Sequence, residues 1–167
     1  MEFFKVIETR RSIRAYHPDR PITDEQLKRI LQAARSAPTA ANKQPYKLVV
    51  IKNPKKTLDF VKQKAVHQAP LVLAIFVDET AAWVRKFDGK NFAWMDGSIV
   101  FEHVILAATA EGLSTVWIAN TDPMAMKKAC NIPTNFQFLA LTPIGYAAEK
   151  PKATSRKPEN EIVSYLE

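Results

Sequence analysis

The sequence predicts a single α+β domain spanning residues 1–167, and three observations favour this class. Apolar residues make up 47% of the chain, which is typical of a soluble protein with a substantial core. Helical and strand patterns are interleaved without the strict alternation that a parallel βαβ sheet would require. No stretch has the composition of an interdomain linker, and 167 residues suit one domain.

The chain opens with a short helical pattern, because residues 2–9 place three apolar side chains on one side of a helix. Residues 12–18 are expected to be extended and end at a proline. Residues 21–38 form the clearest amphipathic helix of the chain. Thr23 and Gln26 make a capping box at its start, which predicts where that helix begins.

The next segments predict strand, helix and strand in that order. Residues 46–52, "YKLVVIK", suit a strand, and residues 53–66 suit a helix with Asn53 as its cap and a proline in its first turn. Residues 69–78 contain the longest apolar run, which suits a buried strand and is too short to span a bilayer. Residues 79–95 are rich in aromatic and charged side chains and give no clear prediction.

Residues 96–112 are apolar nearly all round, so we expect a helix buried in the core or in a subunit interface. Residues 114–120 and 136–146 predict two further strands. Between them, residues 122–130 predict a short helix that begins at Asp122 and a proline. The last twenty residues are polar and contain two prolines, so they need a surface on which to dock.

The bulk properties restrict the class of partner and the compartment. The formal net charge is +7, which fits either a solvated basic surface or a partner that carries phosphates. Cys130 is the single cysteine, so no disulfide forms within the chain, and a reducing cytoplasmic setting is expected. The start "MEFFKVIETRR" lacks the long apolar stretch of a secretory signal.

The segment "ETRRSIRAYHP", residues 8–18, concentrates three arginines that repel one another. In an extended chain, alternate side chains share a face, which would group Arg10, Ser12, Arg14 and Tyr16 and turn Ile13 and Ala15 toward the core. The two outer arginines would stand about 13 Å apart, so one could clamp a phosphate while the other reaches a second acceptor. An ordinary solvated basic strand accounts for this segment equally well.

A second candidate segment is "SAPTAANKQPY", residues 36–46. Its small residues would let the backbone approach a flat ligand closely. The amides of Asn42 and Gln44 offer paired donors and acceptors for the edge of a heteroaromatic ring. The alternative is a plain turn between helix and strand, in which the amides cap the local backbone.

The order of these motifs resembles the FMN-dependent nitroreductase family. The sequence "RRSIRAY" is followed by "SAPTAANKQPY", then by "DGSIVFEHVILAATAEGLSTVWIAN", and finally by "TPIGYAAEKPKATSRKP". Each motif alone is weak, but all four occur in the family's order over nearly the whole chain. The resemblance implies an α+β fold with a central, mostly antiparallel sheet in an intertwined homodimer. Two FMN sites would lie at the subunit interface, and the tail from about residue 147 to 167 would embrace the partner.

The resemblance also implies which residues bind FMN. Arg10 would meet the phosphate with Arg156 as a second contact, and Arg14 would lie near the pyrimidine end of the flavin. Residues 38–40 would come from the other subunit, and residues 118–120 would pass the ring near its reactive N5. The complete set is Arg10, Arg11, Ser12, Arg14, Pro38, Thr39, Ala40, Asn42, Gln44, Ile118, Ala119, Asn120 and Arg156.

The activity that the resemblance implies is an oxidoreductase that takes hydride from NADH or NADPH. Nitroaromatic or quinone-type acceptors would then be reduced in a ping-pong cycle. No catalytic protein residue is predicted, because the flavin carries the chemistry. The three histidines lack the spacing of metal ligands, so no metal is expected, and Cys130 is interpreted as a structural thiol.

Some positions depart from the family pattern. Ser114 and Ala119 stand where glycine is common, Thr154 replaces a basic residue that is sometimes present, and the chain is short around residues 79–95. Acceptor preference is therefore left open. One alternative is a flavin-binding relative with another redox or flavin-processing role. A basic nucleic-acid-binding module is disfavoured, because the lysines are scattered and no nucleic-acid motif is present. No membrane partner is expected.

Overall fold

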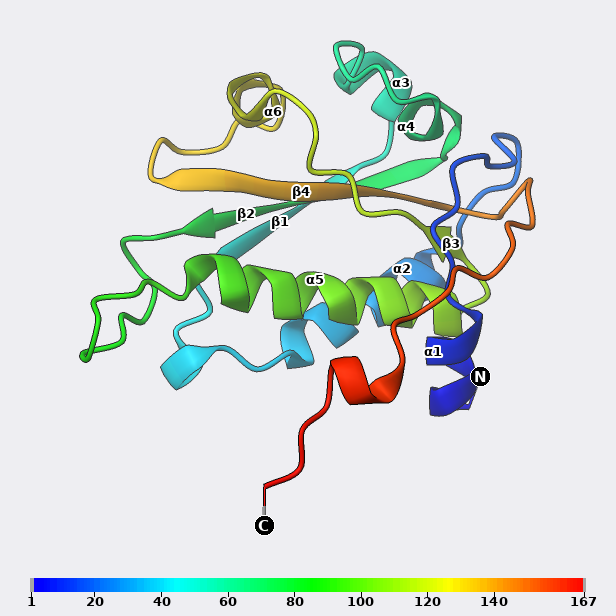
Figure 1. Ribbon diagram of the computed structural model, residues 1–167. Coiled ribbons are helices and arrows are strands. Elements are labelled where there is room, and N and C mark those ends of the chain that lie inside the picture. Colours follow the sequence, from blue (N-terminus) through cyan, green and yellow to red (C-terminus); the bar gives the residue numbers. More distant parts are fainter. Residues whose placement is uncertain (1, 167) are drawn as a thin grey trace.

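The computed structural model describes residues 2–166, and its centre is a four-stranded sheet (Figure 1). The strands are β1 (Tyr46–Ile51), β2 (Leu71–Asp78), β3 (Ser114–Thr115) and β4 (Phe136–Gly145). Their spatial order is β1-β2-β4-β3, and each neighbouring pair is antiparallel. The predicted α+β class with a central antiparallel sheet is confirmed. Residues 1 and 167, the ends of the expected domain, lie outside the described part of the chain.

Helices cover both faces of this sheet (Figure 1). One face is covered by α2 (Asp24–Ser36) and α5 (Ala93–Ala110). The other is covered by the short helices α3 (Pro54–Thr57), α4 (Lys64–Gln68) and α6 (Pro123–Ala129). Helix α1 (Phe3–Thr9) packs against α5, away from the centre of the sheet.

Strand β2 is buried along its whole length, because its alternating side chains enter two separate cores. Leu73 and Ile75 pack with residues of α2 and α5. Val72, Ala74 and Phe76 pack into the second core, under α3, α4 and α6. The continuous apolar run that predicted a buried strand therefore reflects a sheet covered on both faces.

The predicted helix starts at residues 23 and 122 are confirmed. The Thr23 hydroxyl accepts a hydrogen bond from the Gln26 backbone N–H (3.2 Å), and the Gln26 side chain accepts one from the Thr23 N–H (3.1 Å). The Asp122 carboxylate likewise accepts from two backbone N–H groups in the first turn of α6. Local side-chain chemistry thus fixes the start of both helices.

The segment after β2 forms an extended loop that leads into α5. Val84 and Asn91 pair across it, Arg85 forms an ion pair with Asp88, and Gly89 takes a positive φ of 70° at the turn. Helix α5 begins at Ala93, three residues before its predicted start. Within residues 2–166, no helix is both long and apolar enough to cross a membrane.

The single helix predicted over residues 53–66 is wrong. The chain forms α3 and α4 with an irregular segment between them, and Asn53 makes no side-chain cap. Leu58 leaves the helical conformation (φ −119°), and both Leu58 and Val61 are fully buried in the core. Burial of these side chains outweighs the helix preference of the surrounding lysines.

The strand predicted over residues 114–120 is also shorter than expected. Only β3 pairs continuously with β4, and the Val116 N–H then donates to the Thr142 hydroxyl (3.3 Å) instead of to a backbone carbonyl. Ile118 returns to the sheet as an isolated bridge with Leu141. The side-chain hydrogen bond therefore interrupts the ladder that the sequence predicts.

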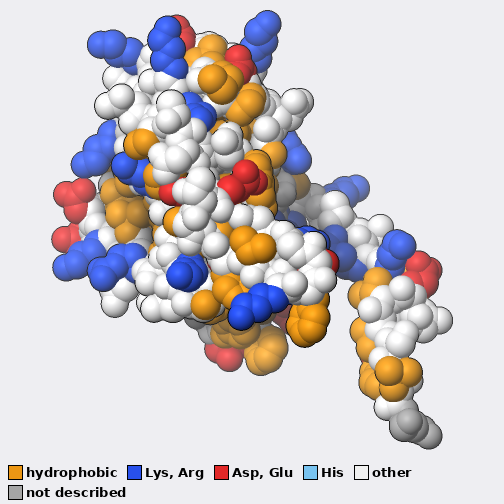
Figure 2. Space-filling model, turned by 90° about the vertical axis from the view of Figure 1, so that its left-hand side faces the viewer, with side chains coloured by type: hydrophobic (Ala, Val, Ile, Leu, Met, Phe, Trp, Pro, Cys, Tyr) orange, Lys and Arg blue, Asp and Glu red, His pale blue; other side chains and the backbone are white. Residues whose placement is uncertain are grey.

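The C-terminal tail follows β4 and runs away from the body of the protein (Figures 1 and 2). Its described part, which ends at residue 166, contains one 3-10 turn, Glu159–Glu161. Beyond that turn, Ile162 is 67% exposed, Tyr165 82% and Leu166 98%. Apolar side chains at this exposure indicate a segment that is not covered by its own chain.

Candidate functional site

The arginine-rich segment that follows α1 runs beside β3. Ser12 pairs with Thr115 in parallel, and the Ile13 N–H donates to the Thr115 carbonyl (2.9 Å). The Arg14 N–H donates to the carboxylate of Glu149, which lies on the segment after β4. The structure therefore places residues 12–13 beside Thr115, at the start of residues 114–120.

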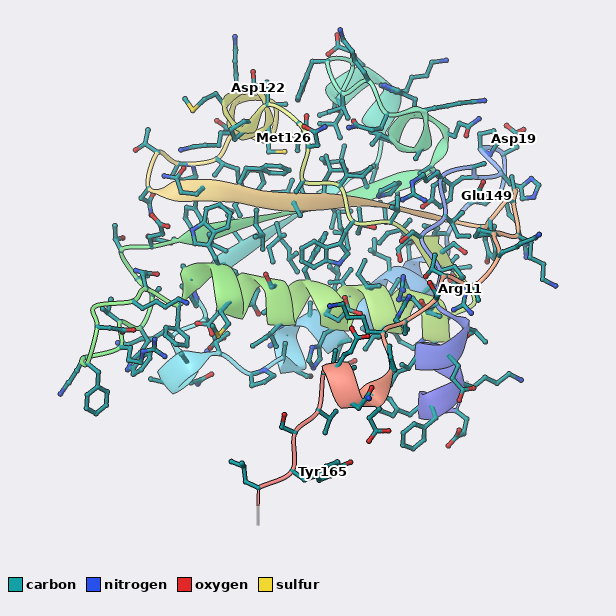
Figure 3. The ribbon with its side chains drawn as sticks, in the orientation of Figure 1. Arg11, Asp19, Asp122, Met126, Glu149 and Tyr165 are labelled. Atoms are coloured by element: carbon teal, nitrogen blue, oxygen red, sulfur yellow. The ribbon has the colours of Figure 1, made fainter. Side chains whose placement is uncertain are left out.

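A cavity of about 430 Å³ lies at the C-terminal end of α5. Arg10 and Arg11 line it from one side, and Glu149 and Lys150 line it from the segment after β4. Arg11 and Glu149 lie at this same end of the molecule (Figure 3). The Arg11 guanidinium donates to the carbonyl of Glu8 (2.6 Å), so its own helix end helps to orient it.

A second cavity, of about 290 Å³, is lined by Arg14, Trp117 and Ile118. Gln63 and Lys64, at the start of α4, also line this cavity. One five-residue segment thus lines two cavities, with Arg10 in the first and Arg14 in the second.

A side-chain hydrogen bond connects a residue of the second cavity with the segment of residues 119–120. The Gln63 side-chain amide donates to the Asn120 carbonyl (2.8 Å), which ties the start of α4 to the segment after Ile118. Ala119 and Asn120 are exposed, whereas Ile118 is buried. The predicted residues 118–120 therefore lie beside the cavity that contains Arg14.

The remaining predicted segment, residues 38–44, lies at the opposite end of α5. It forms a 3-10 turn, η1 (Ala40–Asn42), and the Ala40 N–H donates to the carboxylate of Asp96 in the first turn of α5 (2.9 Å). Thr109 lines the first cavity, and it stands about 20 Å from Asp96 along the helix axis. Within one chain, residues 38–44 line neither of the two cavities.

Arg156 is also separate from both cavities. Its guanidinium donates to the Thr154 hydroxyl (2.6 Å) and to nearby tail carbonyls. The tail on which it sits leads away from the body. In this chain Arg156 is therefore not grouped with Arg10, and its predicted phosphate contact stays a prediction.

The prediction that Tyr16 shares a face with Arg14 is wrong. Tyr16 is buried in the same core as Ile13, and its hydroxyl donates to the Ile13 carbonyl (2.8 Å). The segment makes two isolated bridges of opposite direction, Ser12 to Thr115 and Tyr16 to Ala147, so simple alternation is lost. Burial raises the pKa of the Tyr16 phenol; nearby Glu149 raises it further, while Arg14 lowers it.

The sequence analysis did not single out several residues that line the cavities, among them Gln63, Lys64, Glu149 and Lys150. The first pair lies where a continuous helix was expected, and the second pair follows the last strand in a polar segment without periodicity. No local pattern marks them. Contacts of Gln63 with Asn120 and of Glu149 with Arg14 connect two of them to predicted site residues, and the cavity linings identify Lys64 and Lys150.

The thiol of Cys130 is half-buried, just after α6. Burial raises its pKa to about 11, so the thiolate is scarce at neutral pH. This environment agrees with the prediction of a structural thiol.

Comparison with known proteins identifies the family. The model of the nitroreductase family matches residues 7–60 and 55–146. A nitroreductase family protein from Clostridium difficile 630 is 34% identical in sequence, and its crystal structure matches this one with a TM-score of 0.89 over 99% of this chain and 98% of that chain.

Two further matches extend over similar lengths. An NADH dehydrogenase from Thermus thermophilus is 29% identical over 187 aligned residues, covering 92% of this chain and 91% of that protein. An FMN complex from Exiguobacterium sibiricum 255-15 has the same fold, with a TM-score of 0.86 at 21% identity and coverage of 99% and 98%. By the match to the family model and the 34% identical structure, this chain belongs to the nitroreductase family.

Proposed function

We propose that this protein is an FMN-dependent oxidoreductase that takes hydride from NADH or NADPH and reduces nitroaromatic or quinone-type acceptors in a ping-pong cycle. The observation that carries the proposal is the segment from Arg10 to Arg14, which lines two cavities at once. A ligand with a phosphate at one end and a flat ring at the other fits such an arrangement. The FMN complex of a protein with the same fold supports that choice of ligand.

The residues of the first cavity fit a phosphate. Arg10, Arg11 and Lys150 supply cationic donors, and the volume of about 430 Å³ falls in the usual range for ligand sites. Glu149 opposes them with a negative charge, but its carboxylate already accepts the Arg14 N–H. We infer that the arginines hold the phosphate while Glu149 fixes the path of the segment.

The residues of the second cavity fit the ring of a flavin. Trp117 and Ile118 provide apolar walls, and Arg14 provides a positive charge. Bound FMN would supply the group that accepts hydride from the donor and passes it to the acceptor. Arg14 would favour negative charge on the ring, and the exposed Ala119 and Asn120 would leave this side of the site open to substrates.

A second copy of the chain would complete the site. Residues 38–44 are too far along α5 to reach these cavities within one chain, so we infer that they meet the flavin bound by a partner protomer. The exposed Phe3 and Phe4 of α1 and the apolar end of the tail offer surfaces for that contact. The expected homodimer and the docking of the tail both belong to this proposal.

An experiment on flavin retention and flavin reduction tests the proposal. The purified protein is loaded with FMN, freed of unbound FMN, and mixed anaerobically with NADH or NADPH. Retained flavin that is bleached supports the oxidoreductase and identifies the preferred donor. Retained flavin that neither donor bleaches favours another flavin role, and failure to retain flavin refutes the assignment.

Arg14→Ala sharpens this test because the side chain is exposed and enters the second cavity. Loss of a charged contact should weaken FMN binding about tenfold. Arg35→Ala removes a comparable exposed arginine from the end of α2, away from both cavities, and should leave FMN affinity unchanged. Equal affinity of the two variants would remove Arg14 from the site.

A further inference from the structure

The segment between α2 and β1 holds an unusual backbone conformation. Ala41, Asn42 and Gln44 have φ values of 50°, 53° and 50°, in the left-handed region that favours glycine. Asn tolerates this region, but Ala and Gln adopt it only with strain. Such a conformation persists when the surrounding structure holds it in place, and it is often found at functional sites.

Several hydrogen bonds hold this segment. The Gln44 N–H donates to the Thr39 hydroxyl (3.0 Å), and the Gln44 side-chain amide donates to the Asn42 side-chain oxygen (3.2 Å). Both bonds stay within the segment. Another bond joins the segment to the body of the protein, because the Ala40 N–H donates to Oδ1 of Asp96 on α5 (2.9 Å).

The burial of the Asp96 carboxylate lowers the stability of the fold, so a contribution to stability does not explain its position. Its side chain is only 2% exposed, and among residues 2–166 its second oxygen, Oδ2, is buried without a hydrogen-bond partner. A buried carboxylate oxygen without a partner destabilises the folded state, although the N-terminal turn of α5 offsets part of this. What the carboxylate provides is a strong, charge-assisted anchor for one backbone N–H.

The helix that carries Asp96 is itself fixed against the sheet. The next residue, Gly97, brings α5 so close that an added Cβ would lie 2.5 Å from Val77 and 2.9 Å from Leu139. Asp96 therefore cannot follow the segment if the segment moves, and the position of Ala40 is set by the position of α5.

We propose that Asp96 is a positioning residue that holds residues 39–44 in the strained conformation in which they meet the flavin of a partner protomer. The inference rests on the proposed function and adds the residue that aligns this half of the site. Asp96 does not touch the flavin; it acts through the Ala40 N–H, and thereby sets where the amides of Asn42 and Gln44 point.

The test compares Asp96→Ala, Asp96→Asn and Ser98→Ala in the FMN-loaded protein. Ser98→Ala is the matched control, because Ser98 lies in the same region of α5 and its hydroxyl donates to the Trp94 carbonyl of its own helix. The readouts are the FMN dissociation constant, the visible flavin spectrum, and amide exchange at Ala40. A purely structural role would lower the melting temperature without changing the spectrum or the affinity of the folded protein.

We expect Asp96→Ala to weaken FMN binding about tenfold, to alter the flavin spectrum and to speed Ala40 exchange at least about tenfold. Asp96→Asn keeps an acceptor oxygen and should recover much of the affinity. Unchanged FMN affinity and spectrum in folded Asp96→Ala would overturn the inference and leave the proposed function standing. If the wild-type protein retains no flavin, the proposed function fails first and this inference fails with it.

Discussion

Gly97→Ala should destabilise the protein, although alanine is the better helix former. The added Cβ would lie 2.5 Å from Cγ1 of Val77 and 2.9 Å from Cδ2 of Leu139, well inside normal contact distance. Val77 is fully buried in the central strand, so it has no open space into which to move. Overpacking costs typically 1–3 kcal/mol, and two contacts below 3.0 Å place this site in the upper part of that range, at about 2–3 kcal/mol. The helix preference of alanine returns about 1 kcal/mol, so we expect a net loss of about 1–2 kcal/mol.

Urea unfolding at a fixed protomer concentration measures this loss of free energy. In a thermal unfolding experiment, the same loss should lower the melting temperature by roughly 2–8 °C for a chain of this size. Ser98→Ala is the control, because it changes the neighbouring position without entering the contact between α5 and the sheet. A Gly97→Ala protein at least as stable as the wild type would refute the close approach of α5 to Val77 and Leu139.

Three other predictions follow from local features. Gln26→Ala should lower the free energy of unfolding by about 1–2 kcal/mol in chemical denaturation, because it removes half of the capping box and the hydrogen bond to the Glu111 carbonyl (3.1 Å). Ala41→Gly should raise stability by about 0.5–1 kcal/mol in the same assay, since glycine adopts the left-handed conformation without strain. Alkylation of Cys130 at pH 8 should be about a hundredfold slower than that of a free thiol, because the pKa of Cys130 lies near 11 instead of the ordinary 9.0. The alkylation rate should increase as the pH rises toward 11.

Each of these has a matched control and a contrary outcome. Gln32→Ala removes an exposed amide from the same helix as Gln26 and should change the stability little. An equal loss of stability in the Gln26→Ala and Gln32→Ala proteins would contradict a stabilising role of the capping box. Ala33→Gly lies inside α2 and should destabilise by about 1 kcal/mol, opposite in sign to Ala41→Gly. Alkylation of Cys130 in urea should proceed at the rate of a free thiol, and a fast reaction in the folded protein would contradict its burial.

Helix starts that depend on neighbouring residues can be predicted from the sequence. Helix breaks and side-chain burial that depend on tertiary contacts cannot. The caps at Thr23 and Asp122 are short-range chemistry, so the starts of both helices follow from the residues alone. The break after α3 follows from burial of Leu58, and the burial of Tyr16 accompanies two isolated bridges from its segment to Thr115 and Ala147, far along the chain. None of these long-range contacts leaves a pattern in the neighbouring residues.

The candidate site shows the same division. The arginine segment was recognised from its own spacing and from the family resemblance, and the structure places it beside residues 114–118. Gln63 and Glu149 were missed because they join the site through single contacts with segments far along the chain. Residues 38–44 lie at the other end of α5, so one chain alone does not show how they join the site.

The central position of β2 has a consequence for synthesis of the chain. Its apolar stretch, Val72–Val77, emerges from the ribosome with β1 already present on one side. Its other neighbour, β4, begins only at Phe136. Until then the nascent chain carries an uncharged strand with one open edge, the kind of segment that pairs with other chains. Helix α5 is made in this interval and can cover one face of the strand, but the edge stays open to chaperones or aggregation until β4 arrives.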